Sequence, residues 1–355
     1  MSAQREIVGI QYLRGIAACA VAFDHSSGMA KLDKYFGQTL WGGWLEKGAL
    51  GVDLFFMISG FIIAIVSLQR DDARPSLPLL EFARRRVFRI VPMMWIAIVT
   101  YAILRLAVGV VADPLSYVRA AFVWPIGDLE PNIIWTLRHE AIFYALFAAT
   151  FLSKHWLRPL IILWVLAPFA YAATKLSPAD PDIAHALFRS LSHPVNVEFG
   201  FGLALGLVWV KWFHSKSFQA PLLAASSLAY FLGVVAVGNI LDLRADRVPD
   251  TLVSATLFTP LMILAVWGCA RENRLALLLG NASFSIYLFH SHIVSAALKM
   301  WAKIAHTTPI AIVVCTTAII SIAAGIAIHL FLEQPIQKTL ANWWRSRRAK
   351  KHIAA

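Results

Sequence analysis

The chain has 355 residues, of which 59% are hydrophobic and only 15% are charged. Soluble domains carry about 25% charged residues, so the composition excludes an ordinary soluble domain and indicates a membrane protein with most of its mass in lipid. The formal net charge is +12, and its meaning depends on which side of the membrane the basic residues occupy. The three cysteines lie far apart in apolar stretches, which predicts neither a disulfide framework nor a cysteine metal site.

Apolar segments of transmembrane length follow one another along the chain. Ten can be placed, at residues 7–25, 49–69, 87–108, 133–152, 158–174, 195–212, 219–240, 252–269, 280–298 and 309–332. The predicted fold is therefore all-α, a polytopic membrane protein with about ten transmembrane helices in one bundle. The predicted domains are a transmembrane domain at residues 1–340 and a basic tail at residues 341–355. We expect the first segment to be retained and not cleaved as a signal peptide, because nine more apolar segments follow it.

The basic residues predict the orientation of these helices. With a cytoplasmic N-terminus, nineteen Lys and Arg residues fall on the cytoplasmic side and ten in outside loops. The positive-inside rule therefore predicts that both termini are cytoplasmic. The basic stretch Trp343–His352 then suits anionic lipid headgroups better than nucleic acid. We expect membrane lipids, and no nucleic acid, among the partners.

The first segment, Ile7–His25, combines an apolar helix with Arg14 and His25. A charged residue at helix-centre depth costs about 2.5–3.5 kcal/mol on insertion scales, so Arg14 is expected to have a task. Eleven residues separate Arg14 from His25, which places them on nearly the same helical face about 16 Å apart. An imidazole can take a proton from a hydroxyl near neutral pH. Alternatively, His25 is an interfacial residue satisfied by Asp24 or water.

Asp53 opens the second segment at a predicted depth close to that of His25. A carboxylate at this depth could orient an imidazole or pair with a cation. An acid favoured by the helix dipole explains Asp53 equally well.

Four arginines stand at the predicted start of the third segment, namely Arg84, Arg85, Arg86 and Arg89. Arg86 and Arg89 are three residues apart and share a face. Guanidinium groups at a helix N-terminus suit phosphate binding. The alternative is that the arginines only anchor the helix on the cytoplasmic side.

The fourth segment carries Arg138, His139 and Glu140 after Trp135. Such residues within an apolar span should face the bundle interior and pair there. Glu140 could be the counter-ion of Arg14 or of a cytoplasmic arginine, or it could belong to a purely structural ion pair.

The ninth segment carries a polar stripe. Ser283, Tyr287 and His290 follow the i, i+4, i+7 spacing of one helical face. His290 and His292 point in different directions, so a two-histidine metal site is not expected, and we predict no metal site in the chain.

Six stretches in this order resemble the acyltransferase-3 family of integral membrane acyltransferases, and more closely its exopolysaccharide-modifying members. They are Leu13-Arg14-Gly15-Ile16-Ala17-Ala18 with His25; Gly51–Phe61; Arg86-x-x-Arg89-Ile90-x-Pro92; Trp135-x-Leu137 with Glu140 and Phe143-Tyr144; Ser285-Ile286-Tyr287-Leu288-x-His290; and Phe331-Leu332-Glu333-x-Pro335. The resemblance covers nearly the whole chain. It implies a ten-helix protein of the bacterial inner membrane. The implied reaction transfers an acyl group, usually acetyl, from cytoplasmic acyl-coenzyme A to a hydroxyl of an extracytoplasmic or lipid-linked carbohydrate.

The resemblance also assigns expected roles. Arg14 and His25 would be the catalytic pair. As our own hypothesis, His25 acts as general base or becomes briefly acylated, with Asp53 as an orienting carboxylate. Arg86 and Arg89 would contact the coenzyme A phosphates, and Glu140, Tyr287 and His290 would line the same cavity. To these we add Arg85 and Glu140 as expected coenzyme A contacts, and Trp135 and Ser285 as expected cavity residues. No cofactor would be tightly bound, because acyl-coenzyme A is a substrate. The family often has Trp-Ser-Leu and then apolar residues before its acid, whereas this chain has Thr136 and Arg138-His139, which leaves the role of Glu140 open.

Two other classes of protein use similar residues. A proton-coupled secondary transporter also needs intramembrane Arg, Glu and His, but the chain has no repeat symmetry of the transporter kind. A structural subunit of a polysaccharide export machine is the third alternative. The sequence leaves open the acceptor glycan, acetyl or succinyl as the acyl group, and whether the protein is a homo-oligomer.

Overall fold

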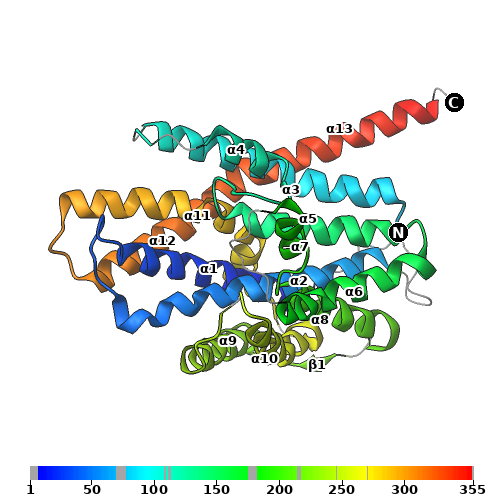
Figure 1. Ribbon diagram of the computed structural model, residues 1–355, viewed down its shortest axis with the longest axis horizontal. Helices are drawn as coiled ribbons and strands as arrows, with labels where there is room; N and C mark the ends of the chain where they lie inside the picture. Colours follow the sequence, from blue (N-terminus) through cyan, green and yellow to red (C-terminus); the bar gives the residue numbers. More distant parts are fainter. Residues whose placement is uncertain are drawn as a thin grey trace.

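The computed structural model describes residues 7–68, 77–107, 109–110, 113–174, 182–213, 217–244, 246–269 and 271–353. These residues are almost entirely helical (Figure 1). The elements are α1 (Val8–Ala30), η1 (Leu40–Ala49), α2 (Leu50–Ser67), α3 (Leu79–Ala107), α4 (Pro114–Ala121), α5 (Ile134–Ala149), α6 (Lys154–Ala173), α7 (Ile183–Leu191), α8 (Asn196–Val208), η2 (Trp209–Phe213), β1 (Phe218–Gln219), α9 (Leu223–Ile240), α10 (Val248–Trp267), β2 (Gly268–Cys269), α11 (Arg274–Ile304), α12 (Ile310–Ile328), η3 (His329–Glu333) and α13 (Gln334–Ile353). The two strands form a two-residue parallel pair, so the all-α prediction is confirmed apart from this pair.

The long helices lie side by side as one bundle, from which α13 extends (Figure 1). Helix α1 packs mainly against α11, η1 and α2, while α2 packs mainly against α8. Helices α9 and α10 lie on one side of the bundle, and α4 and α13 lie on the other (Figure 1). Because α1 contacts protein on several sides, its polar residues can line interior cavities.

Among the described residues, seven helical stretches are long and apolar enough to cross a membrane, so this is a multi-pass membrane protein. They are Leu40–Ser67, Leu79–Ala107, Ile183–Trp212, Leu223–Ile240, Val248–Trp267, Arg274–Ile304 and Ile310–Arg347. Helices also occur at the three other predicted segments, as α1, α5 and α6. These three helices are not both long and apolar enough to be counted among the seven. Helix α5 has only 16 residues. The number of ten transmembrane helices therefore stays a prediction.

Several helices extend beyond the apolar segments that predicted them. Helix α1 continues to Ala30 and α3 begins at Leu79, eight residues before the predicted start. The added turns of α3 are held by Glu81, which pairs with Arg84 and Arg85 at i+3 and i+4 spacing. Helix α13 runs across the predicted domain boundary at residue 340. Some of the basic residues that predicted the orientation, among them Arg5, Arg70 and Arg74, lie outside the described residues.

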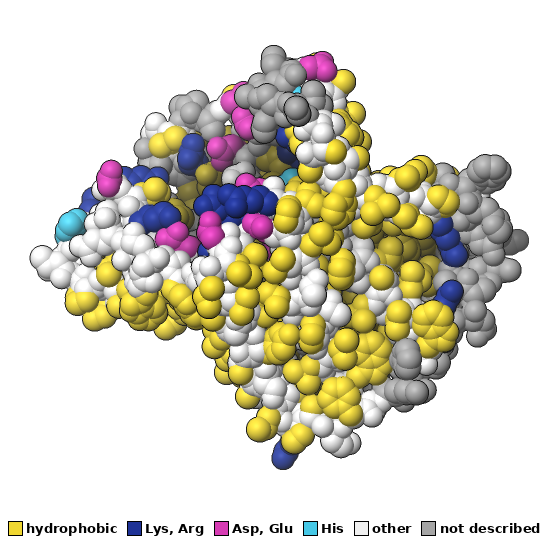
Figure 2. Space-filling model, turned by 60° about the horizontal axis from the view of Figure 1, so that its bottom comes forward, with side chains coloured by type: hydrophobic (Ala, Val, Ile, Leu, Met, Phe, Trp, Pro, Cys, Tyr) yellow, Lys and Arg dark blue, Asp and Glu magenta, His cyan; other side chains and the backbone are white. Residues whose placement is uncertain are grey.

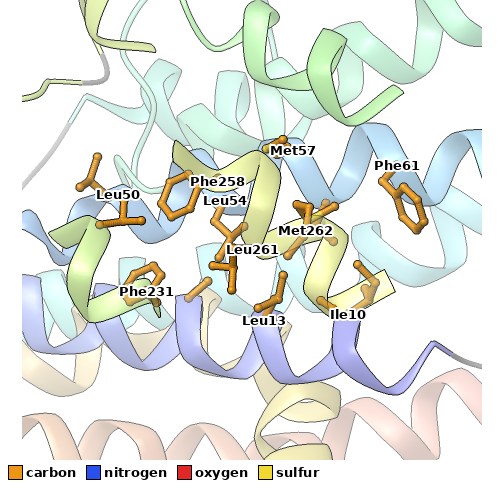
Figure 3. Packing of buried hydrophobic residues seen from close by; sticks show 14 of the residues in the cluster. Ile10, Leu13, Leu50, Leu54, Met57, Phe61, Phe231, Phe258, Leu261 and Met262 are labelled. Atoms are coloured by element: carbon orange, nitrogen blue, oxygen red, sulfur yellow. The ribbon is translucent and has the colours of Figure 1, made fainter. Parts of the chain in front are cut away.

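The largest hydrophobic cluster joins α1, α2, α9 and α10. Figure 3 shows Leu13 of α1, Leu54 of α2 and Leu261 of α10 directed toward one another. Phe231 and Phe258 stack beside them with ring centroids 6.0 Å apart. This cluster fixes α1 and α2 relative to each other, and both helices carry residues of the candidate site.

Glycines allow α2 and α8 to approach closely. A Cβ added at Gly202 would lie 1.9 Å from the carbonyl oxygen of Met57, whereas a Cβ at Gly233 on α9 would meet nothing within 4 Å. We therefore expect Gly202→Ala to destabilise the protein by about 1–3 kcal/mol, because the two helices must move apart. Thermal unfolding in detergent measures this effect. Gly233→Ala is the matched control, and equal melting temperatures for the two variants would contradict the prediction.

Candidate active site

A cavity of about 90 Å³ lies between α1, α2, α3, α5 and α11, and we call it the inner cavity. Its polar lining comes from Arg14, Ser59, Arg86, Arg89, Thr136, Glu140, Tyr144, Ser283 and Tyr287. Five predicted site residues are thus brought together here from four helices, namely Arg14, Arg86, Arg89, Glu140 and Tyr287. The remaining lining is mainly aromatic and aliphatic.

A second cavity of about 570 Å³ adjoins the first near the N-terminal end of α1, and we call it the basic cavity. Arg14 and Arg89 line both cavities, so the two cavities adjoin at these side chains. Its other polar residues are Gln11, Arg84, Arg85, Asn281, His329, Glu333, Gln334 and Gln337. The arrangement offers a wide basic entrance and a narrow inner end.

The arginines of α3 differ in how they are held. Arg84 and Arg85 both bond to Glu81, with Arg84 making two hydrogen bonds to its carboxylate. The guanidinium of Arg86 instead lies 5.2 Å from the ring centroid of Tyr144, and its Nε has no hydrogen-bond partner among the described residues. Arg86 therefore keeps more of its capacity to bind an anion than Arg84 or Arg85.

One expectation about these arginines is wrong. Because α3 begins at Leu79, Arg86 and Arg89 lie in its second and third turns and not at its start. The backbone N–H groups that are free at a helix N-terminus are therefore about 10 Å away along the helix. Anion binding at Arg86 and Arg89 has to come from side chains.

Glu140 shares the inner cavity with the arginines but bonds to hydroxyl groups. It accepts hydrogen bonds from Ser59 Oγ, at 3.2 Å, and from the Tyr144 hydroxyl. Thr136 Oγ1 and the Tyr287 hydroxyl lie 2.9 Å apart at the cavity wall. The residue that interrupts the family's usual Trp-Ser-Leu pattern thus keeps a hydroxyl at this position, and that hydroxyl contacts Tyr287.

His25 and His290 meet beyond the Tyr287 end of the inner cavity. Their ring centroids lie 4.4 Å apart with edge-to-face geometry, and the rings of Tyr287 and His290 lie 5.6 Å apart. His25 Nδ1 is 3.0 Å from Asp24 Oδ2 and 3.2 Å from the Val21 carbonyl oxygen. With its proton on Nδ1, His25 can bond to these acceptors and keeps the Nε2 lone pair for chemistry.

His290 is fully buried, and its Nδ1 lies 2.5 Å from the Tyr287 carbonyl oxygen. Its Nε2 has no hydrogen-bond partner within the described part of the chain. The His290 ring therefore contacts both the His25 ring and the Tyr287 ring, and so lies between His25 and the cavity wall that Tyr287 provides.

The sequence had suggested that Asp53 lies against His25, but the two residues do not meet. It is fully buried and interacts with Glu198 of α8 and Ser254 of α10. The carboxylate that contacts His25 is Asp24. The difference arises because Asp53 lies on the face of α2 that packs toward α8, which similarity in depth cannot reveal.

Two other predicted cavity residues also lie outside the inner cavity. Ser285 Oγ donates to Glu333 Oε2 at 2.7 Å, so it supports a wall of the basic cavity. Trp135 lies beside His139 and His193, with ring centroids 5.8 and 5.6 Å away. Neither side chain lines the inner cavity.

The sequence did not predict that residues at the junction of α12 and α13 form a hydrogen-bonded group beside the arginines. His329 Nδ1 lies 2.7 Å from Glu333 Oε2, and Gln337 Nε2 donates to Glu333 Oε1 at 3.0 Å. These side chains form the wall of the basic cavity opposite the arginines. A histidine and an acid at i and i+4 near the end of an apolar segment were the available signal. Across the described residues, no three His, Cys, Asp or Glu side chains gather in a way that could hold a metal ion.

Comparisons with known proteins give the family. The sequence model of the acyltransferase-3 family, described as an acyltransferase domain, matches residues 7–329. The chain is 33% identical over 305 residues to the exopolysaccharide production protein ExoZ of Rhizobium meliloti (strain 1021), which covers 81% of this chain and 89% of that protein. It is 22% identical to the O-acetyltransferase OatA of Staphylococcus aureus (strain NCTC 8325 / PS 47), over 95% of this chain and 58% of that protein.

The acyltransferase MdmB of Streptomyces mycarofaciens is 24% identical over 83% of this chain and 82% of its own length. No solved structure matches the chain. The family match runs from α1 to the first residue of η3, so it includes every helix that lines the inner cavity, whereas Glu333, Gln334 and Gln337 of the basic cavity lie beyond it. This multi-pass membrane protein therefore belongs to the acyltransferase-3 family.

Proposed function

We propose that the protein transfers an acyl group, most simply acetyl, from acyl-coenzyme A to a hydroxyl of a carbohydrate on the other side of the membrane. The observation that carries the proposal is the adjoining pair of cavities, in which a basic cavity and an inner cavity share Arg14 and Arg89 and the inner cavity ends at Tyr287. His25 and His290 lie just beyond that wall. The names of ExoZ and OatA support a polysaccharide acceptor and an acetyl group.

The donor would enter from the end at which α1 begins. Its phosphates would bind in the basic cavity to Arg89 and the neighbouring arginines, because one guanidinium group can donate two parallel hydrogen bonds to a phosphate group. The pantetheine arm would then pass Arg14 into the inner cavity. The distance from Arg14 to His25 along the continuous helix α1 is about 16 Å, a span that suits an arm of this kind. In this proposal the arginine end is cytoplasmic and the His25 end faces outward across the bacterial inner membrane.

At the inner end, His25 would act as a general base. As the acceptor oxygen attacks the thioester carbonyl carbon, its proton moves to His25 Nε2. Asp24, bonded to Nδ1, stabilises the imidazolium that forms. The intermediate then collapses with cleavage of the carbon–sulfur bond, and the imidazolium returns the proton to the departing thiolate. Tyr287 and Thr136 offer hydroxyl donors on the wall of the cavity where the thioester would lie.

The purified protein tests this proposal directly. With acetyl-coenzyme A labelled in the acetyl group, and with cell-surface polysaccharide freed of its ester groups by mild base, we expect label to appear on the polysaccharide and free coenzyme A to be released. A transporter would neither bind nor consume acetyl-coenzyme A. Failure to bind acetyl-coenzyme A at millimolar concentration would overturn the proposed function.

A further inference from the structure

A third cavity, of about 580 Å³, lies at the C-terminal end of α1, and we call it the outer polar cavity. It is formed by η1, the first turn of α2 and the connection between α9 and α10. Figure 2 shows basic and acidic side chains gathered around a hollow, beside a broad hydrophobic surface. None of the residues that line the inner cavity lines this one.

Two carboxylate oxygens of this cavity are buried without a hydrogen-bond partner among the described residues. They are Oδ1 of Asp53, whose side chain is 1% exposed, and Oε1 of Glu46. The other oxygen of Glu46 is bound by Lys31 at 2.6 Å. A buried acceptor without a donor costs free energy, so these atoms indicate a missing donor.

The basic side chains that line this cavity already have hydrogen-bond partners within the protein. Lys47 Nζ lies 2.7 Å from Asp242 Oδ1 and 3.0 Å from the Leu243 carbonyl oxygen, and Arg244 donates to the other oxygen of Asp242. The Asn239 amide nitrogen donates to two backbone carbonyl groups. The groups left for a ligand are therefore mainly acceptors, which suits a molecule rich in hydroxyl groups and disfavours an anionic headgroup.

An exposed aromatic residue is adjacent in sequence to the lining of this cavity. Trp41 is 63% exposed and directly precedes Gly42 and Gly43, which line the cavity. All three residues have positive φ values, of 47°, 62° and 81°. A left-handed backbone conformation is unfavourable for tryptophan, so the turn that exposes this side chain lowers the stability of the folded protein. A flat aromatic face combined with carboxylate acceptors is well suited to the apolar face and the hydroxyl groups of a sugar ring.

The outer polar cavity adjoins the candidate base through η1. Gly48 packs against α1, where an added Cβ would lie 2.3 Å from the Ala20 carbonyl oxygen and 3.1 Å from Asp24 Cβ. Asp24 is the carboxylate bonded to His25. A chain of sugars that occupied this cavity would thus lie next to the helix turn that carries the base.

We propose that the outer polar cavity binds sugar rings of the acceptor. Neutral sugars would donate hydroxyl hydrogens to Asp53 and Glu46, and Trp41 would pack against a ring face. The assignment rests on the proposed acyl transfer, since it names the place where the acceptor is held.

The test uses purified full-length protein, acetyl-coenzyme A and base-treated oligosaccharides from the surface polysaccharide. We expect Trp41→Ala and Asp53→Asn each to raise the KM for the oligosaccharides about tenfold or more, as for an aromatic anchor of an interface. The dissociation constant for acetyl-coenzyme A should stay at the wild-type value. Trp124→Ala is the matched control, because Trp124 is 53% exposed and, unlike Trp41, has no sequence neighbour in the lining of the outer polar cavity, and the KM of this variant should not change.

The outcomes separate this proposal from the proposed function. If the wild-type protein neither binds acetyl-coenzyme A nor transfers acetyl, the function is wrong. If the wild type transfers acetyl and Trp41→Ala keeps the wild-type oligosaccharide KM, the acceptor is held elsewhere and the inference is wrong. Because Asp53 is fully buried, Trp41→Ala decides the matter if Asp53→Asn does not fold. Competition by anionic phospholipid vesicles that is lost in Trp41→Ala would show a lipid site instead and also overturn the inference.

Discussion

His25→Ala is expected to lower the rate of acyl transfer about 10²- to 10⁴-fold, which is the usual contribution of a positioned general base. The affinity for acetyl-coenzyme A should stay unchanged, because His25 lies beyond the Tyr287 wall and not among the arginines. The measurement is the single-turnover rate of acetyl transfer at saturating donor, together with the donor dissociation constant. His306→Ala is the matched control, because His306 is exposed and stacks on Phe36 at 5.4 Å.

Wild-type transfer rates in His25→Ala would contradict both versions of the mechanism. Rapid quench of the wild-type protein in the absence of acceptor then separates them. Acetyl-His25 on that time scale would support a covalent intermediate, and its absence would favour direct transfer. The short contact between Asp24 and His25 Nδ1 serves either version, because it leaves Nε2 as the reacting atom.

The sequence was sufficient to identify the residues that must be in the bundle interior, and the reason is energetic. Arg14, Glu140 and Tyr287, which were predicted within apolar segments, line the inner cavity. Arg86 and Arg89, which were predicted at the cytoplasmic start of the third segment, line it as well. A charge or hydroxyl in an apolar segment can avoid lipid only by facing protein or water, so such residues converge wherever the helices allow. The spacing of polar residues on one helix was also informative. It predicted that Ser283, Tyr287 and His290 share a face, and all three lie on α11.

The sequence could not show which helix faces meet. Asp53 and His25 have similar depths, yet Asp53 contacts Glu198 and Ser254, and His25 contacts its neighbour Asp24. Pairing of this kind depends on the rotation of each helix, which packing fixes through contacts far apart in sequence. The start of α3 was also misplaced, because hydropathy marks where a helix meets lipid and not where its backbone hydrogen bonds begin.

Arg89→Ala is expected to raise the KM for acetyl-coenzyme A about tenfold to a hundredfold, because hydrogen bonds between charged groups contribute about 1.5–3 kcal/mol each. Arg89 lines both the basic and the inner cavity, so it lies where the phosphates of the donor must pass. Arg85→Ala should have a much smaller effect, since Arg85 is 44% exposed and already paired with Glu81. Initial rates over a range of donor concentrations, at two salt concentrations, measure both effects.

A change in the donor makes this prediction specific to the phosphates. Acetyl-dephospho-coenzyme A lacks the 3′-phosphate, and the wild type should bind it more weakly than acetyl-coenzyme A. If Arg89 contacts that phosphate, Arg89→Ala should bind the two donors almost equally, because the contact is lost from either side. If the variant keeps the wild-type preference but still has a raised KM, Arg89 contacts the pyrophosphate instead. An unchanged KM for acetyl-coenzyme A in Arg89→Ala would remove the basic cavity from the donor path.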